Sequence, residues 1–163
     1  MPHLDAIYNY ARWLTRSQQD ADDIAQETML RALQYFDSAR GDNIRAWLFT
    51  IARNNCNTCF KRKGIEGPAA AGDASLMDTP AEGPDPQDVL ISKHDAQAMR
   101  GAIEKLPIEY REVLILREME DLSYKEIAAV TECPIGTVMS RLARARTKLA
   151  GDLRGADAKG EGL

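Results

Sequence analysis

Apolar residues recur along the first third of the chain at the three- and four-residue spacing of amphipathic α-helices. Three such runs are separated by short polar stretches at residues 17–20 and 38–43. None of the runs alternates strictly between apolar and polar positions, as a half-buried strand does. The pattern therefore predicts three helices, with apolar positions at Leu4, Ile7, Tyr8, Ala11 and Leu14, at Ile24, Ala25, Thr28, Met29, Ala32, Leu33 and Phe36, and at Ile44, Trp47, Leu48, Ile51, Ala52 and Cys56.

Residues 64–86 interrupt this periodicity. The segment holds four of the seven prolines and four of the eleven glycines, and it has no aromatic residue. Such a composition is typical of a flexible linker, and a structureless stretch of this length is unusual inside one small domain. We therefore predict an all-α protein with two small helical domains, at residues 1–63 and 87–155, followed by a disordered tail at residues 156–163.

The sequence pattern of the second half of the chain predicts four helices, and the last two of them form a helix-turn-helix. Pro107 stops the first of them, because a proline disfavours helical geometry in the residue before it. Ser123 and Glu126 have the spacing of a capping box, in which each side chain binds the other residue's backbone amide at a helix start. The predicted helices cover residues 85–105, 109–118, 124–130 and 135 to about 153, with the turn at residues 131–134.

The helix-turn-helix carries the residue types that this motif needs for packing. Ala128 is small enough to let the second helix approach, and Val138 faces back into the core, with Ile127 and Leu142 completing the contact. The opposite face is basic, since residues 139–154 hold five Arg or Lys residues and one acidic residue although the whole chain has a net charge of -4. Arginine pairs well with guanine, and hydroxyls bond more permissively. The residues expected to contact duplex DNA are Thr137, Ser140, Arg141, Arg144, Arg146 and Lys148.

Composition and cysteine content indicate the class of protein. Apolar residues make up 44% of the chain and charged residues 28%, and no apolar run approaches the ~20 residues that a membrane span needs. The N-terminus lacks the basic segment and uninterrupted apolar stretch of a secretory signal. Three cysteines are too few for a disulfide framework. We therefore expect a cytoplasmic protein without membrane insertion.

The sequence does not show the residue patterns of an enzyme. His3 and His94 have no constellation of Ser, Asp or Cys around them, and there is no glycine-rich phosphate loop. Cys56 and Cys59 form a C-x-x-C pair, but a zinc site needs about four ligands and no second pair exists. Packing within a helix is the simpler interpretation of this pair, with a redox role as the alternative. We predict no catalytic activity, no metal and no cofactor.

Two segments of the chain resemble one known family. Residues 20–54 resemble region 2 of the extracytoplasmic-function (ECF) sigma factors of bacterial RNA polymerase, and residues 104–149 resemble their region 4. Both segments occur in the order of the family and are joined by a linker, as in the family. The resemblance implies an alternative sigma factor that binds core polymerase through the beta-prime clamp helices and the beta flap. It also implies recognition of the −10 and −35 promoter elements and control by an anti-sigma factor.

The resemblance assigns contacts to residues of the N-terminal half. The surface that docks on the beta-prime clamp helices matches Asp22, Asp23, Gln26 and Glu27. For the first two, an alternative is that acids early in a helix merely complement its dipole, which contributes ~0.3–1 kcal/mol. Asn54 falls on the family position that contacts a flipped base of the −10 strand, whereas Trp47, which could be imagined as a stacking platform, is assigned to the core. Suitable groups for further −10 contacts are Arg40, Asn43, Arg53, Lys61, Arg62 and Lys63.

The chain departs from the family pattern in the helix-turn-helix. Met139 stands where relatives often carry Arg or Lys, and Ala143 is small where some carry a larger residue. Readout of the −35 element is therefore expected to rest chiefly on Ser140, Arg141 and Arg144. Glu132 replaces the glycine often found in such turns.

Two other functions are compatible with parts of the sequence. A sigma-like decoy would bind an anti-sigma factor without activating transcription, but the chain has no room for the receiver domain of known mimics. A plain helix-turn-helix repressor would leave the N-terminal resemblance unexplained. Run-off transcription with core polymerase separates the sigma factor from both alternatives, because only a sigma factor yields promoter-dependent transcripts.

Overall fold

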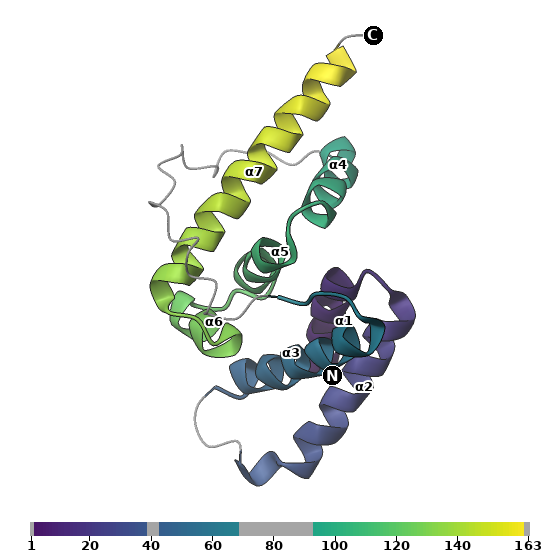
Figure 1. The fold of residues 1–163 in the computed structure, drawn as a ribbon, viewed down its shortest axis with the longest axis vertical. Coiled ribbons are helices and arrows are strands. Elements are labelled where there is room, and N and C mark those ends of the chain that lie inside the picture. Colours follow the sequence, from purple (N-terminus) through teal and green to yellow (C-terminus); the bar gives the residue numbers. More distant parts are fainter. Residues whose placement is uncertain (1, 39–42, 69–92, 162–163) are drawn as a thin grey trace.

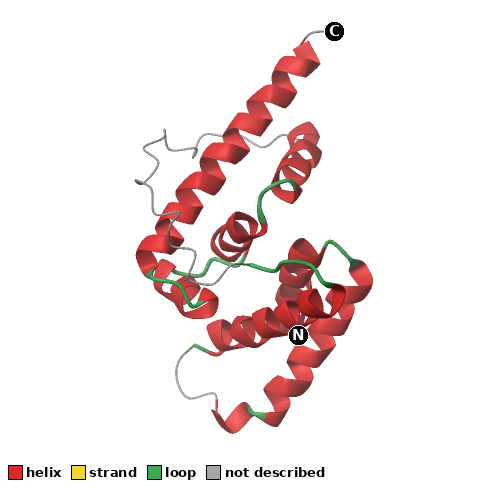
Figure 2. Cartoon of the chain, in the orientation of Figure 1, coloured by secondary structure: helices red, strands yellow, loops and turns green. Residues whose placement is uncertain are grey.

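The structure is a computed structural model that describes residues 2–38, 43–68 and 93–161, and every regular element within these ranges is helical (Figure 2). The all-α fold class predicted from the sequence is confirmed. The elements in chain order are α1 (Pro2–Thr15), α2 (Gln18–Gln34), the short 3-10 helix η1 (Phe36–Ser38), α3 (Ile44–Lys63), α4 (Lys93–Glu104), α5 (Ile108–Leu114), the π-helical turn η4 (Ile115–Met119), α6 (Tyr124–Thr131) and α7 (Ile135–Glu161).

The N-terminal half is a three-helix unit in which α1 and α3 pack on α2 and on each other. Ser17 caps α2 by accepting a hydrogen bond from the backbone amide of Asp20 at 3.2 Å. At the other end of the unit, α3 stops at Gly64, which adopts a left-handed conformation at φ 68°. The rings of Tyr10 and Phe49 meet edge to face in the core, with their centroids 5.4 Å apart.

The C-terminal half follows the predicted order of helices and differs from the prediction in two helices. The helix predicted from residue 85 is described from Lys93 onward, and its predicted start lies outside the described residues. The predicted helix at 109–118 is α5 continued by the π-helical turn η4. The last helix runs on to Glu161, so much of the expected tail is helical.

The two halves pack against each other, with α3 lying beside α6 and α1 contacting α5 and η4 (Figure 1). Buried residues from both halves belong to one continuous core, including Phe49 from α3, Val113 from α5 and Ile127 from α6. The sequence predicted two small domains and gave no relative arrangement. The structure brings both into one packed body, and the segment that joins them, residues 69–92, lies outside the described residues.

Candidate nucleic-acid interface

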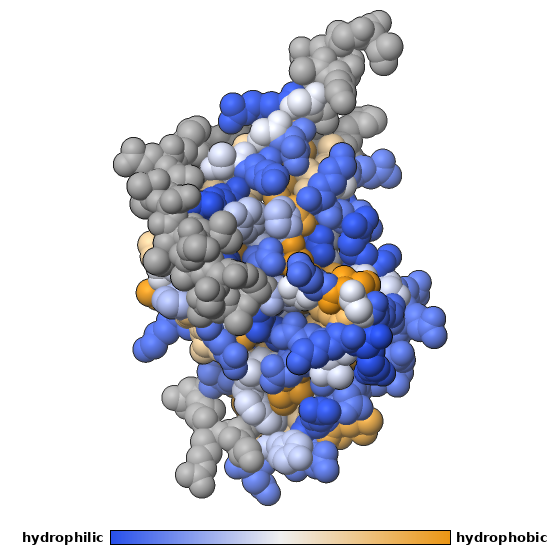
Figure 3. All heavy atoms as spheres, in the orientation of Figure 1, coloured by the Kyte–Doolittle hydropathy of each residue, from blue (hydrophilic) through white to orange (hydrophobic). Residues whose placement is uncertain are grey.

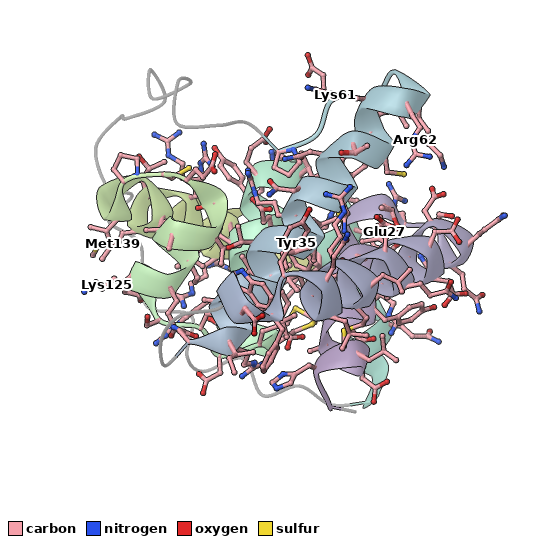
Figure 4. All side chains as sticks on the ribbon, turned by 90° about the horizontal axis from the view of Figure 1, so that it is seen from below. Glu27, Tyr35, Lys61, Arg62, Lys125 and Met139 are labelled. Carbon is pink, nitrogen blue, oxygen red and sulfur yellow. The ribbon has the colours of Figure 1, made fainter. Side chains whose placement is uncertain are left out.

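Helix α3 presents its predicted −10 residues in two different directions. Asn54 is exposed, and the cations at the end of the helix, Lys61, Arg62 and Lys63, are exposed as well. Figure 4 shows Lys61 and Arg62 at the terminal turns of α3. Lys63 forms an ion pair with Asp20 of α2. Arg40 lies outside the described residues.

The other predicted −10 residues of this segment contact the C-terminal half. Arg53 is only 4% exposed and donates from Nε to a carboxylate oxygen of Glu112 at 2.9 Å. Asn43 caps α3 by accepting from the backbone amide of Ala46 at 3.2 Å, and its Nδ2 donates to Glu126 at 2.6 Å. Contact of Arg53 with DNA therefore requires the two halves to separate.

Glu112 is the centre of a buried polar cluster between the halves. Its carboxylate is fully buried and accepts from both Arg53 and the Tyr10 hydroxyl, the latter at 2.7 Å. Burial raises the pKa of Glu112, and the neighbouring Arg53 opposes that rise. Burial, together with the charge of Glu112, also raises the pKa of Tyr10 well above its usual value. A buried carboxylate needs such partners, since an unpaired charge in the interior is strongly unfavourable.

Further polar contacts join the two halves. Arg45 of α3 forms an ion pair with Glu120 at 3.0 Å, next to the π-helical turn. Arg111 of α5 is buried and donates to the backbone carbonyl of Leu14 at 3.2 Å. We call this packing of the N-terminal half against the C-terminal half the closed arrangement. It is stabilised by charged side chains as well as by the shared apolar core.

The helix-turn-helix has the internal packing that the sequence predicted. The capping box is present, with Ser123 Oγ 3.1 Å from the Glu126 amide and Glu126 Oε1 2.9 Å from the Ser123 amide. Ile127, Val138 and Leu142 are buried in the core, and Ala128 packs against it half-buried. Glu132 adopts the left-handed conformation at φ 56°. Glycine adopts this conformation without strain, and it is the residue often found at this position of a helix-turn-helix turn.

The predicted −35 residues on α7 differ widely in exposure. Thr137 and Arg141 are buried at 8% and 5% exposure, and Arg141 Nη1 lies 3.4 Å from Cys133 Sγ. Ser140 and Arg144 are half-exposed and Lys148 is exposed. Arg146 forms an ion pair with Glu118 at 2.6 Å. The side of α7 that faces away from the core also carries two large apolar side chains that the sequence did not assign to DNA, Ile135 and Met139.

The predicted polymerase-binding residues Asp22, Asp23, Gln26 and Glu27 are all exposed on α2. A groove between α2 and α3 is lined by three of them together with Arg62 and Lys63. Apolar side chains continue this surface toward η1, where Leu30, Leu33, Tyr35 and Phe36 are 55–71% exposed. Figure 3 shows apolar surface over this end of α2.

Part of this apolar surface contradicts the sequence pattern. Leu33 and Phe36 had helical spacing with core positions, yet both are exposed because the other two helices do not extend over the end of α2. Leu30 does not belong to the predicted apolar stripe of this helix. A large apolar residue on the polar side of a helix is the one sequence feature that could have predicted a binding surface here.

Cys56 of the C-x-x-C pair belongs to the buried core, and Cys59 packs against it. Cys56 is buried, Cys59 is half-buried, and both are free thiols. Burial raises the pKa of the Cys56 thiol well above its usual value, which disfavours the reactive thiolate. Among the described residues, no group of three or more His, Cys, Asp or Glu side chains is placed to hold a metal ion. None of the described helices is long and apolar enough to cross a membrane.

Comparison with known families accounts for both halves of the chain. Sigma-70 region 2 matches residues 1–64, and Sigma-70 region 4 matches residues 96–149. The chain is 36% identical over 134 residues to the ECF RNA polymerase sigma-E factor of Escherichia coli (strain K12), covering 78% of this chain and 70% of that relative. The chain belongs to the ECF sigma factor family. The N-terminal match removes the plain repressor as an alternative, and sigma factors are transcription initiation factors rather than enzymes.

Other relatives and solved structures support the same assignment. The ECF sigma factor EcfG of Rhodopseudomonas palustris is 39% identical over 144 residues, covering 86% of this chain and 75% of that relative. The sigma factor RpoE of Bartonella quintana, solved in complex with the anti-sigma factor NepR, superposes with a TM-score of 0.72 at 32% identity and covers 93% of this chain and 92% of that one. CnrH, in complex with the cytosolic domain of CnrY, gives a TM-score of 0.64 at 25% identity, with 94% and 84% covered. Both similarities extend over the two halves together.

Proposed function

We propose that this sigma factor acts in the cytoplasm, binds core RNA polymerase and directs initiation at promoters with defined −10 and −35 elements. The exposed face of α2 with Asp22, Asp23, Gln26 and Glu27 docks on the beta-prime clamp helices. The Asn54 side of α3 captures the −10 strand, and the outward face of α7 reads the −35 duplex while the C-terminal half contacts the beta flap. The observation that carries this proposal is the match of regions 2 and 4, in order, on one chain.

The exposed apolar residues at the end of α2 support the polymerase-docking part of the proposal. Leu30 and Leu33 are 63% and 71% exposed and lie one and two turns beyond the polar cluster. A polar rim beside an apolar centre is the usual composition of a protein interface. We therefore extend the docking surface to Leu30, Leu33 and Phe36.

The closed arrangement supports control by an anti-sigma factor. It covers Arg53 and ties Asn43 to Glu126, so two predicted −10 residues are held by the other half of the chain. A similar arrangement over 93% of this chain is found in the relative bound to its anti-sigma factor NepR. We propose that an anti-sigma factor stabilises this closed state in a 1:1 complex and that core polymerase binds the separated state. A complex that leaves core binding unaffected would contradict this proposal.

Run-off transcription on genomic fragments, with core polymerase and the full chain, tests the proposed function. Wild-type protein is expected to yield promoter-dependent transcripts. Asn54→Ala is expected to impair promoter opening and spare duplex binding, and Arg144→Ala to cost on the order of 1–3 kcal/mol in −35 discrimination. The absence of any promoter-dependent transcript would reject the proposal.

Two matched variants control for general effects of these changes. Asn57→Ala makes the same substitution one turn along α3, and Arg154→Ala removes an exposed arginine of α7 beyond the helix-turn-helix. Both are expected to transcribe at the wild-type level. Equal losses in the test and control variants would contradict the residue assignments.

A further inference from the structure

An apolar strip runs along the outward side of α7. It consists of Ile135, Met139 and Ala143, which are spaced four residues apart and therefore lie on one side of the helix. Ile135 is 48% and Met139 is 52% exposed, and Ala143 is half-exposed. Contact of large apolar side chains with water is unfavourable. Their clustering on a short stretch of helix therefore indicates that a binding partner covers them.

The core of the helix-turn-helix does not use this strip. Val138 and Leu142 are buried at 0% and 1% exposure and hold α7 in place. Met139 and Ala143 follow them by one residue, which turns the strip about 100° away from the core residues. Gly136, which follows Ile135 at the start of α7, faces open space, since a side-chain carbon added there would meet nothing within 4 Å.

The surroundings of the strip fit DNA. Lys125 of α6 and Met139 lie on the same outer side of the motif, away from α3 (Figure 4). Ser140 and Arg144 follow the strip on the outward face, and Lys148 is exposed one turn further on. Cations beside a narrow apolar strip suit a major groove, where phosphates flank base edges and each thymine presents a C5-methyl group.

A protein partner fits this strip less well. Three side chains, one of them alanine, cover far less than the ~800 Å² that each partner contributes to a standard protein interface. The small residues Gly136 and Ala143 leave room for close approach of the helix to base edges.

We propose that Ile135, Met139 and Ala143 read thymine methyl groups in the −35 duplex and that Met139 sets the preference. The inference rests on the proposed function, in which α7 docks on that duplex. Met139 makes this contact apolar and therefore suited to thymine, whereas a cation at the same position would suit guanine or phosphate.

The test compares thymine with deoxyuridine, which lacks only the C5-methyl group. Holoenzyme assembled from core polymerase and the full chain is titrated with the promoter duplex identified by run-off transcription, with each −35 thymine replaced in turn. Wild-type holoenzyme is expected to bind about fourfold more weakly when a contacted methyl is removed, the loss that corresponds to ~0.8 kcal/mol for one buried carbon. Met139→Ala is expected to abolish most of this difference.

Three controls separate methyl readout from other effects. Replacement of thymines in the spacer between the two elements is expected to change nothing. Ser140→Ala is expected to weaken binding to both duplexes while preserving their ratio. Met139→Arg is expected to lose the thymine preference and to steepen the salt dependence by about one phosphate contact.

The outcomes distinguish this inference from the proposed function. Promoter-specific binding with equal affinity for thymine and deoxyuridine, a −35 element without thymine, or an unchanged ratio in Met139→Ala rejects the methyl-reading strip and leaves the sigma-factor function in place. A holoenzyme that binds no promoter rejects both.

Discussion

Arg53 of α3 and Glu112 of α5 form a buried ion pair across the two halves of the protein, with 2.9 Å between Nε and the carboxylate oxygen. The two residues lie 59 positions apart in the sequence, and their side chains are 5% and 0% exposed. The pair joins a helix predicted to capture the −10 strand to the half that carries the helix-turn-helix. The effect of substituting either residue on the free energy of unfolding therefore tests whether the two halves pack together.

Arg53→Met is expected to lower the free energy of unfolding by about 3–5 kcal/mol, because it leaves the Glu112 carboxylate buried without its cation. Adding Glu112→Gln to this variant is expected to restore much of the loss, since a neutral amide still accepts from Tyr10. Urea unfolding of the single and double variants measures both effects.

An exposed pair provides the control for this experiment. Arg31 and Glu27 lie one turn apart on α2 and form an ion pair with 3.0 Å between Arg31 Nε and Glu27 Oε1. About half of each side chain is exposed. Arg31→Met is expected to cost at most ~0.5 kcal/mol. A similar cost for Arg53→Met and Arg31→Met would show that the closed arrangement is not held by the buried pair.

Tyr10→Phe removes only the hydroxyl that donates to Glu112 at 2.7 Å. We expect it to destabilise the protein by about 1–3 kcal/mol, because a hydrogen bond to a buried carboxylate is lost. Tyr35→Phe, at a residue that is 55% exposed, is the matched control and is expected to have little effect. Thermal unfolding followed by circular dichroism compares the two variants, and equal transition temperatures would contradict the expectation.

The capping box predicts a pH dependence. Hydrogen bonds from the Ser123 backbone, and then from Asn43, lower the pKa of Glu126 from 4.5. A carboxyl whose pKa is lower in the folded state stabilises the fold above its unfolded pKa, and this stabilisation is lost as the pH falls through the folded pKa. Wild-type protein is expected to be more stable than Glu126→Gln at pH 7.

The difference between wild type and Glu126→Gln is therefore expected to shrink as the pH falls below about 4.5, the ordinary pKa of the side chain. Urea titrations of both proteins across this range measure the difference directly. A gap that stays constant or widens at low pH would contradict the role of the charged carboxylate in the cap.

Glu132→Gly is expected to stabilise the protein by up to about 1 kcal/mol. Glu132 adopts φ 56°, a conformation that disfavours residues with a Cβ and that glycine adopts without this penalty. Glu132→Asn is expected to give a smaller gain, because asparagine tolerates this region better than glutamate, whereas Glu132→Ala is expected to give none. Destabilisation by the glycine variant would mean that the glutamate side chain makes a favourable contact in solution.

The sequence determined the local elements of this protein. Helical periodicity predicted the helices of both halves, and the spacing of Ser123 and Glu126 predicted a cap whose two hydrogen bonds are present. The packing of Val138 into the helix-turn-helix core followed from its position on the amphipathic helix. These features depend on interactions within a few residues or within one motif, and a single chain segment specifies them.

Only the tertiary structure decided how the two halves meet. Arg53 and Arg141 looked like exposed cations from their sequence positions, yet both are buried, and Leu33 and Phe36 had core spacing yet are exposed. Periodicity shows which side of a helix is apolar, but not how far the neighbouring helices extend over it. The Glu112 cluster depends on three helices converging from distant parts of the chain, because only there can the buried carboxylate find a cation and a hydroxyl donor.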